Sequence, residues 1–132
     1  MIWATIAWLT ALYAAHQPLC AIVVSAAVGG VLGIERELRG KSAGIRTFAI
    51  VCMSSCVFTL LSVHAPGVHD STRLAAQVIS GVGFVCAGVI WRKPDQLEGL
   101  TTAAGMWGVA AIGMAIGYGF ASYAFTAMIA AL

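Results

Sequence analysis

The chain has 132 residues, of which 61% are hydrophobic and 9% are charged, with a formal net charge of +2. Soluble domains average about 45–50% apolar and about 25% charged residues, so this composition excludes a soluble globular protein. The few basic residues alternate with acids, which excludes a nucleic-acid-binding surface. The sequence therefore predicts an all-α integral membrane protein.

Residues 1–18 form an apolar amino-terminal segment that contains two tryptophans and a tyrosine. As a helix, residues 1–15 would reach about 22 Å, which is less than the ~30 Å thickness of the hydrocarbon core. Because aromatic side chains favour the membrane interface, we expect an interfacial or lead-in helix here. Pro18 is well placed to start the next helix. With no basic residue ahead of the apolar run, a cleaved signal peptide is not expected.

Five apolar stretches are predicted to be transmembrane helices, which together form a membrane domain over residues 19–132. The expected spans are about 19–34, 48–63, 74–91, 101–117 and 120–132. Small residues at spacings of three and four let membrane helices approach closely. The predicted helix-packing positions are Ala26, Gly29, Gly30, Gly33, Ser80, Gly81, Gly83, Gly88, Gly105 and Gly108. These small-residue faces predict a homo-oligomer.

Few polar or reactive side chains interrupt the apolar stretches. Gln77 places an amide inside the third span, where an unpaired polar group is costly, so we expect it to face a partner helix. Four cysteines lie in apolar runs without metal-binding spacing, and we interpret them as packing residues with no structural disulfide. The sequence shows no catalytic triad, phosphate-binding loop or zinc-protease motif, so an enzyme is not expected.

The segment 35–46 holds four of the seven Lys/Arg residues and two of the five acids. Glu35 with Arg39, and Glu37 with Lys41, have the i,i+4 spacing of helical ion pairs. We therefore expect the first span to continue as a helix past the membrane edge.

A turn and a second helix are expected to follow. Gly40 and Gly44 permit the turn, and Arg46 and Thr47 open the next helix. Because a cation at a helix N-terminus opposes the macrodipole, Arg46 is expected to have an anionic partner. The candidates are a glutamate of this segment, Glu98 or a lipid phosphate.

Basic residues also indicate the orientation in the membrane. Six of the seven Lys/Arg residues fall in two loops, around residues 35–47 and 92–99, that alternating spans place on one side. The positive-inside rule assigns these loops to the cytoplasm. The amino terminus is then outside and the carboxyl terminus inside.

Three separated blocks, within residues 33–47, 75–90 and 99–113, resemble the MgtC/SapB family of bacterial inner-membrane proteins. The resemblance implies a multi-pass inner-membrane protein tied to magnesium limitation and, in pathogens, to survival inside phagocytes. One characterised member of the family restrains the proton-driven ATP synthase rather than carrying magnesium. Cys86 departs from the glycine usual at its position, and we expect no counterpart of the soluble C-terminal domain that some relatives carry. The implied signature and functional residues are Glu35, Arg36, Glu37, Arg39, Lys41, Gly44, Arg46, Thr47, Gln77, Glu98, Thr101 and Thr102.

These charged residues allow two interpretations. They could form a cytoplasmic mouth that contacts a partner or an ion, or they could be a solvated, self-neutralising set of ion pairs that anchors the protein at the lipid surface. Glu35, Glu37 and Glu98 could in principle coordinate hydrated Mg²⁺ through oxygen ligands. Neighbouring Arg and Lys side chains would compete with that cation, so we predict no metal site and no cofactor.

Three histidines, His16, His64 and His69, are expected outside the membrane, with Asp70 beside them. Because histidine titrates near pH 6.5, one hypothesis is that they sense external acid. The alternative, ordinary polar loop residues, is favoured.

The leading hypothesis is a small polytopic inner-membrane protein that modulates another membrane complex, such as ATP synthase, under magnesium or acid stress. The rival hypothesis is an oligomeric ion or solute channel or transporter. Transporters carry ionisable groups near the middle of the bilayer, whereas here they cluster at the predicted membrane edges. The sequence therefore favours the modulator.

Overall fold

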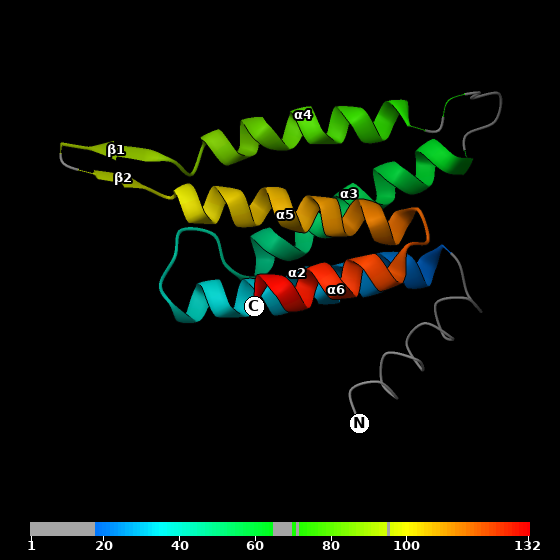
Figure 1. Ribbon diagram of the computed structural model, residues 1–132, viewed down its shortest axis with the longest axis horizontal. Coiled ribbons are helices and arrows are strands. Elements are labelled where there is room, and N and C mark those ends of the chain that lie inside the picture. The colour runs from blue at the N-terminus through cyan, green and yellow to red at the C-terminus, as the bar shows by residue number, and fades with distance from the viewer. Residues whose placement is uncertain (1–17, 65–69, 71, 95) are drawn as a thin grey trace.

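The computed structural model describes residues 18–64, 70, 72–94 and 96–132. Its helices lie side by side along one long axis, and a two-stranded hairpin projects from one end (Figure 1). The helices are α2 (Leu19–Leu38), α3 (Ile45–His64), α4 (Arg73–Ala87), α5 (Leu100–Gly117) and α6 (Ala121–Ala131), with strands β1 (Trp91–Lys93) and β2 (Gln96–Glu98). The predicted all-α membrane fold is thereby confirmed. The expected helix over residues 1–18 lies outside the described residues except for Pro18, which directly precedes α2.

Three of these helices are long and apolar enough to cross a membrane: α2 and α3 with 20 residues each, and α5 with 18. The other two are shorter, since α4 has 15 residues and α6 has 11, or about 22 Å and 16 Å. The predicted span 74–91 was wrong at its carboxyl end, because the helix ends at Ala87. Trp91 instead pairs with Glu98 across the antiparallel hairpin, so its backbone takes part in a strand pair and not in the helix.

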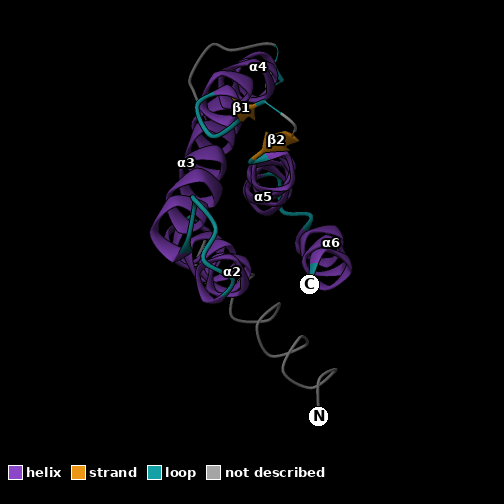
Figure 2. Cartoon of the chain, turned by 90° about the vertical axis from the view of Figure 1, so that its left-hand side faces the viewer, coloured by secondary structure: helices purple, strands orange, loops and turns teal. Residues whose placement is uncertain are grey.

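Helix α3 contacts α2, α4 and α5, and it lies along one side of the bundle, between α4 and α2 (Figure 2). Its buried side chains are small or apolar, including Phe48, Cys52 and Cys56. The buried hydroxyls of Ser55 and Thr59 donate to carbonyl oxygens one turn earlier, at 2.8 and 2.9 Å. The helix itself thus satisfies these two hydroxyls, which lets neighbouring helices pack close to it.

Glycines set the contact between α2 and α3. A Cβ on Gly29 would lie 2.5 Å from the Phe48 carbonyl oxygen, and one on Gly33 would lie 2.6 Å from the Ile45 Cα. At Gly30 the nearest atom would be 3.8 Å away. The predicted close approach is therefore confirmed at Gly29 and Gly33, whereas Gly30 does not contribute to it.

Helix α5 approaches α3 in the same way. A Cβ on Gly113 would lie 2.1 Å from the Cys52 carbonyl oxygen, and one on Gly117 would lie 2.7 Å from Thr59 Cβ. A Cβ on Gly105 would lie 3.2 Å from the Phe48 ring, whereas one on Gly108 would have no atom within 4 Å. Within one chain, α5 is therefore close to α3 at Gly105 but not at Gly108, and the prediction omitted the two closest positions.

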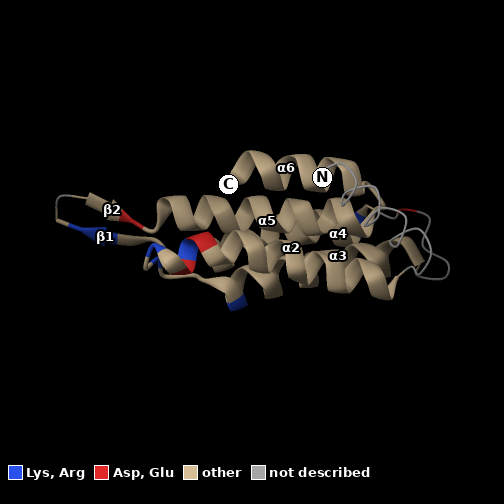
Figure 3. Cartoon of the chain, turned by 90° about the horizontal axis from the view of Figure 1, so that it is seen from below, with Lys and Arg blue, Asp and Glu red and all other residues tan. Residues whose placement is uncertain are grey.

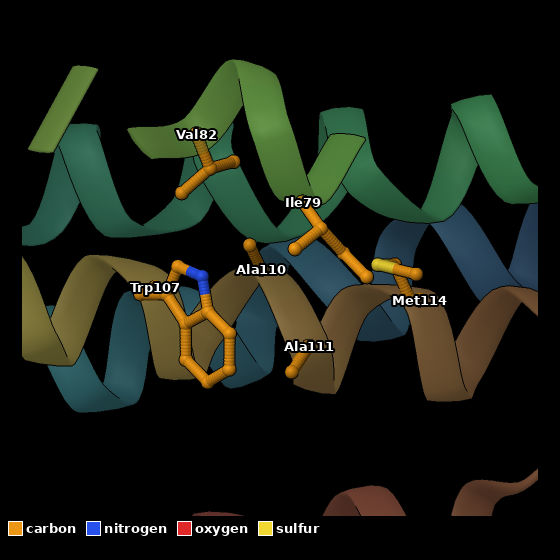
Figure 4. A pocket seen from close by; sticks show the side chains of 6 residues that line it. All are labelled: Ile79, Val82, Trp107, Ala110, Ala111 and Met114. Carbon is orange, nitrogen blue, oxygen red and sulfur yellow. The ribbon is translucent and has the colours of Figure 1, made fainter. Parts of the chain in front are cut away.

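Helix α4 buries few of its side chains. Only Ala75, Val78 and Cys86 are buried, and the Cys86 thiol lies 3.2 Å from the Ala103 carbonyl oxygen of α5. The predicted packing residues Ser80, Gly81, Gly83 and Gly88 are all exposed. A cavity of about 130 Å³ remains between α4 and α5, lined by Ile79, Val82, Trp107, Ala110, Ala111 and Met114 (Figure 4).

Candidate functional site

Charged side chains gather at the two ends of the helix bundle (Figure 3). In the described part of the chain they occur only within residues 35–46, 70–73 and 92–98. The first and third of these segments lie at the same end, which we call the charged end. It contains most of the residues predicted from the sequence to be functional.

Arg36 occupies the centre of the charged end. Its guanidinium donates a 3.0 Å hydrogen bond to the Thr102 hydroxyl, 66 residues away in sequence, and thereby ties α2 to α5. It also lies 3.6 Å from Glu35, whose carboxylate in turn accepts a 2.6 Å contact from Arg39. We call Glu35, Arg36, Arg39 and Thr102 the ionic cluster. The predicted i,i+4 pair between Glu35 and Arg39 is confirmed.

The Arg36 side chain is only 12% exposed. Its Nε atom is buried and, among the described residues, has no hydrogen-bond acceptor. A buried charged donor without an acceptor is costly. The small part of the Arg36 side chain that stays exposed is where an oxygen of a partner protein or of a small anion could contact the ionic cluster.

A pocket of about 440 Å³ leads away from the ionic cluster, between α2, α5 and α6. Glu35, Arg36, Arg39 and Thr101 line its polar mouth. Its apolar lining residues include Leu32, Phe48, Val109, Ile112 and Ala127. The polar groups are confined to the mouth, so the pocket suits a ligand or peptide segment with one polar end.

Glu37 has a different role from the one predicted. Its carboxylate accepts a 2.9 Å hydrogen bond from the backbone N–H of Ile45, the first residue of α3. Because α2 ends at Leu38, Lys41 is not on the helix, and the predicted Glu37–Lys41 pair was wrong. A Cβ at Gly44 would lie 2.5 Å from the Glu37 carboxylate, which explains the glycine there. Gly40, at φ +62°, makes the predicted turn.

Glu98 does not join the ionic cluster. It lies on β2 and forms a 2.5 Å ion pair with Lys93 of β1, so these two opposite charges neutralise each other across the hairpin. In the described part of the chain no three His, Cys, Asp or Glu side chains could together hold a metal ion. The three glutamates considered as a magnesium site are thus not brought together.

Arg46, Thr47 and Gln77 lie outside the ionic cluster. All three line a second groove, between α3 and α4. Arg46 forms no ion pair with any side chain in the described ranges. Of its predicted partners, the glutamates of segment 35–46 and Glu98 therefore do not pair with it.

The opposite end carries His64, Asp70 and Arg73. The His64 ring Nδ1 lies 2.9 Å from the Leu60 carbonyl oxygen. Asp70 accepts hydrogen bonds from the Thr72 hydroxyl and backbone N–H, which lowers the pKa of its carboxyl. His16 and His69 lie outside the described residues, so acid sensing stays a prediction.

Comparison with known proteins places these residues in context. The family model described as "MgtC family" matches residues 22–132. Protein SapB of Bacillus subtilis (strain 168) is 44% identical over 115 residues, 80% of this chain and 50% of SapB. Protein MgtC of Brucella suis biovar 1 (strain 1330) is 37% identical over 115 residues, 87% of this chain and 48% of that protein.

A third relative carries a transport-related name. The "Putative magnesium transporter YhiD" of Escherichia coli (strain K12) is 43% identical over 107 residues, 74% of this chain and 49% of that protein. The chain thus spans about half the length of the curated relatives it matches, and no solved structure matches it. With the family model covering most of the chain and the SapB and MgtC similarities extending along the same region, the chain belongs to the MgtC family.

Proposed function

We propose that this protein is a multi-pass protein of the bacterial inner membrane that supports magnesium homeostasis and adaptation to low magnesium or acid by modulating another membrane complex. The proton-driven ATP synthase is the complex that the family resemblance suggests. In this proposal the charged end faces the cytoplasm, since it carries six of the seven Lys/Arg residues. The names MgtC and "putative magnesium transporter" among the relatives support the link to magnesium.

The observation that carries the proposal is the buried Arg36 in the mouth of a pocket at the charged end. Its Nε–H has no acceptor within the residues that the structure describes, and its other contacts hold the guanidinium in place. A carboxylate or carbonyl of a partner protein that entered this pocket would contact the exposed part of the Arg36 guanidinium. Charged groups with fixed geometry at an interface give specificity of partner choice.

The second candidate is a magnesium channel or transporter, which the printed name of the Escherichia coli relative favours. In such a protein, ionisable side chains line the path near the middle of the membrane. The described charged residues lie instead at the ends of the bundle (Figure 3). We therefore rank modulation above transport.

Growth of a bacterial strain lacking its own copy of the gene, in medium limited for magnesium, tests the modulator. We expect Arg36→Gln to accumulate in the membrane but to fail to restore growth. Arg39→Gln is the matched control, because Arg39 contacts the same glutamate but is 67% exposed, and it should restore growth. Full growth with Arg36→Gln would contradict a role for the ionic cluster.

Purified protein in liposomes separates the two candidates. Magnesium flux without any added partner would replace the modulator with the transporter. Recovery of a membrane complex with the wild-type protein from native membranes, and its loss with Arg36→Gln, would support modulation and identify the partner.

A further inference from the structure

A groove of about 650 Å³ runs between α3 and α4. The two helices run antiparallel (Figure 1), so the lining extends from Arg46 and Val85 near the charged end to Phe58 and Leu74. Arg46 and Phe58 are twelve residues apart on one helix, which corresponds to about 18 Å. One leaflet of the hydrocarbon core is about 15 Å thick. The groove is thus about as long as one leaflet is deep.

The walls of this groove are mostly hydrocarbon. Ile50, Phe58, Leu74 and Val85 line it, and each is between 44% and 50% exposed. Apolar side chains at this depth in a membrane are stabilised by contact with other apolar groups rather than with water. The occupant of the groove must therefore present hydrocarbon along most of its length.

The charged end of the groove is cationic. Arg46 is exposed in the first turn of α3, where the helix macrodipole is also positive. The glutamates described nearby are already engaged: Glu35 with Arg39 and Arg36, Glu37 with the Ile45 N–H, and Glu98 with Lys93. An anion beside Arg46 would be stabilised by the guanidinium, which has no ion-pair partner in the described ranges.

These features together match an amphiphile with an anionic head and a hydrocarbon tail. We propose that the groove between α3 and α4 binds one anionic phospholipid from the leaflet at the charged end. Its phosphate lies on Arg46, and one acyl chain lies along Ile50 and Val85. The proposal is independent of which membrane complex the protein modulates.

A second copy of this chain is a less suitable occupant. Neither α3 nor α4 carries an acidic residue, so insertion of either helix would leave Arg46 without a counter-charge. Gln77, which also lines the groove, provides a way to distinguish the two occupants. A Gln77→Leu change would remove a hydrogen bond between two copies but would leave an anionic lipid bound.

Native mass spectrometry of the full chain, extracted from nanodiscs containing equal phosphatidylglycerol and phosphatidylcholine, tests the proposal. We expect wild-type protein to retain phosphatidylglycerol about tenfold over phosphatidylcholine, as one charge-assisted contact provides. Arg46→Gln should remove this preference. Arg92→Gln is the matched control, because Arg92 is an exposed cation of the same end on the hairpin, and it should keep the preference.

A second pair of variants tests the hydrocarbon part of the site. Gly81 lines the groove and Gly83 does not, yet neither has an atom within 4 Å of its Cβ position. Gly81→Leu should fold and lose bound lipid of either head group, whereas Gly83→Leu should retain it.

Three results would overturn the proposal. The first is equal retention of both lipids by the wild type, or an unchanged preference in Arg46→Gln. The second is displacement of phosphatidylglycerol by millimolar inorganic phosphate, which would indicate a site for free anions. The third is a lipid-free dimer that becomes monomeric on Gln77→Leu, which would indicate that a second copy fills the groove.

Discussion

Helices α5 and α4 both carry glycines, but those glycines have different surroundings. On α5, Gly113 and Gly117 lie against the backbone and side chains of α3, where an added Cβ would come within 2.1 and 2.7 Å of its neighbours. On α4, Gly81 and Gly83 have no atom within 4 Å. The same residue type therefore fixes the core of the bundle in one helix and leaves an open surface in the other.

The largest expected effect is at the close α5–α3 contact. Gly113→Ala would place a methyl group against the Cys52 carbonyl oxygen, so the helices must separate. We expect a loss of about 3 kcal/mol in the free energy of unfolding, at the upper end of the cost of overpacking. Thermal unfolding in detergent, followed by tryptophan fluorescence, measures it.

Gly108→Ala on the same helix is the control, because its Cβ position is open, and it should change the stability by less than about 0.5 kcal/mol. The pair Gly29→Ala and Gly30→Ala should repeat this difference on α2. Equal stabilities for Gly113→Ala and Gly108→Ala would show that α5 and α3 are not in close contact.

A smaller effect is expected at the start of α3. Glu37→Ala removes the acceptor of the Ile45 N–H, and loss of a helix cap costs about 1 kcal/mol. Hydrogen exchange at the Ile45 amide should become faster. Glu98→Ala, which breaks only an exposed ion pair on the hairpin, should leave that amide unchanged. Unchanged exchange in Glu37→Ala would indicate that another group caps α3.

The open face of α4 should tolerate substitution. Gly83→Ala adds a methyl group that meets nothing within 4 Å and improves helix propensity, so we expect a gain of about 0.5 kcal/mol. The same unfolding measurement, at two protein concentrations, detects it. A loss of stability relative to the wild type that disappears on dilution would instead place this face in a homo-oligomer contact.

The smallest effect concerns Asp70, which is fully exposed. Hydrogen bonds from the Thr72 hydroxyl and backbone N–H lower the pKa of the Asp70 carboxyl in the folded chain. The ionised Asp70 carboxylate therefore stabilises the folded chain at pH values above the ordinary carboxyl pKa of about 3.9. This stabilisation is lost as the pH falls through the lowered pKa. Exchange at the Thr72 amide should quicken relative to neighbouring amides in this acid range. Asp70→Asn should abolish that pH dependence, and its persistence in the variant would assign it to another group.

Much of the helical architecture could be predicted from the sequence, because hydropathy and charge are local properties. The extension of the first helix to Leu38 and the Glu35–Arg39 pair follow from i,i+4 spacing alone. Helix α3 begins at Ile45, close to the predicted start of the second span.

Contacts between distant segments could not be predicted in the same way. The hydrogen bond between Arg36 and Thr102 joins residues 66 positions apart. Residue spacing indicates which face of a helix carries small side chains, but it does not indicate which other helix packs against that face. The stripe on α4 was therefore expected to pack and is exposed. Gly113 and Gly117, themselves four residues apart, carried the packing signal that the prediction overlooked.

The hairpin formed by β1 and β2 has a consequence for how the chain matures in a bilayer. Isolated two-stranded ribbons are only marginally stable in water, and this one exposes 67% of Trp91 and 61% of Leu97. Tryptophan partitions to the level of the lipid head groups, so the ribbon gains its missing apolar contacts only once the neighbouring helices are inserted. We therefore expect the ribbon to become ordered only after the protein has reached its membrane.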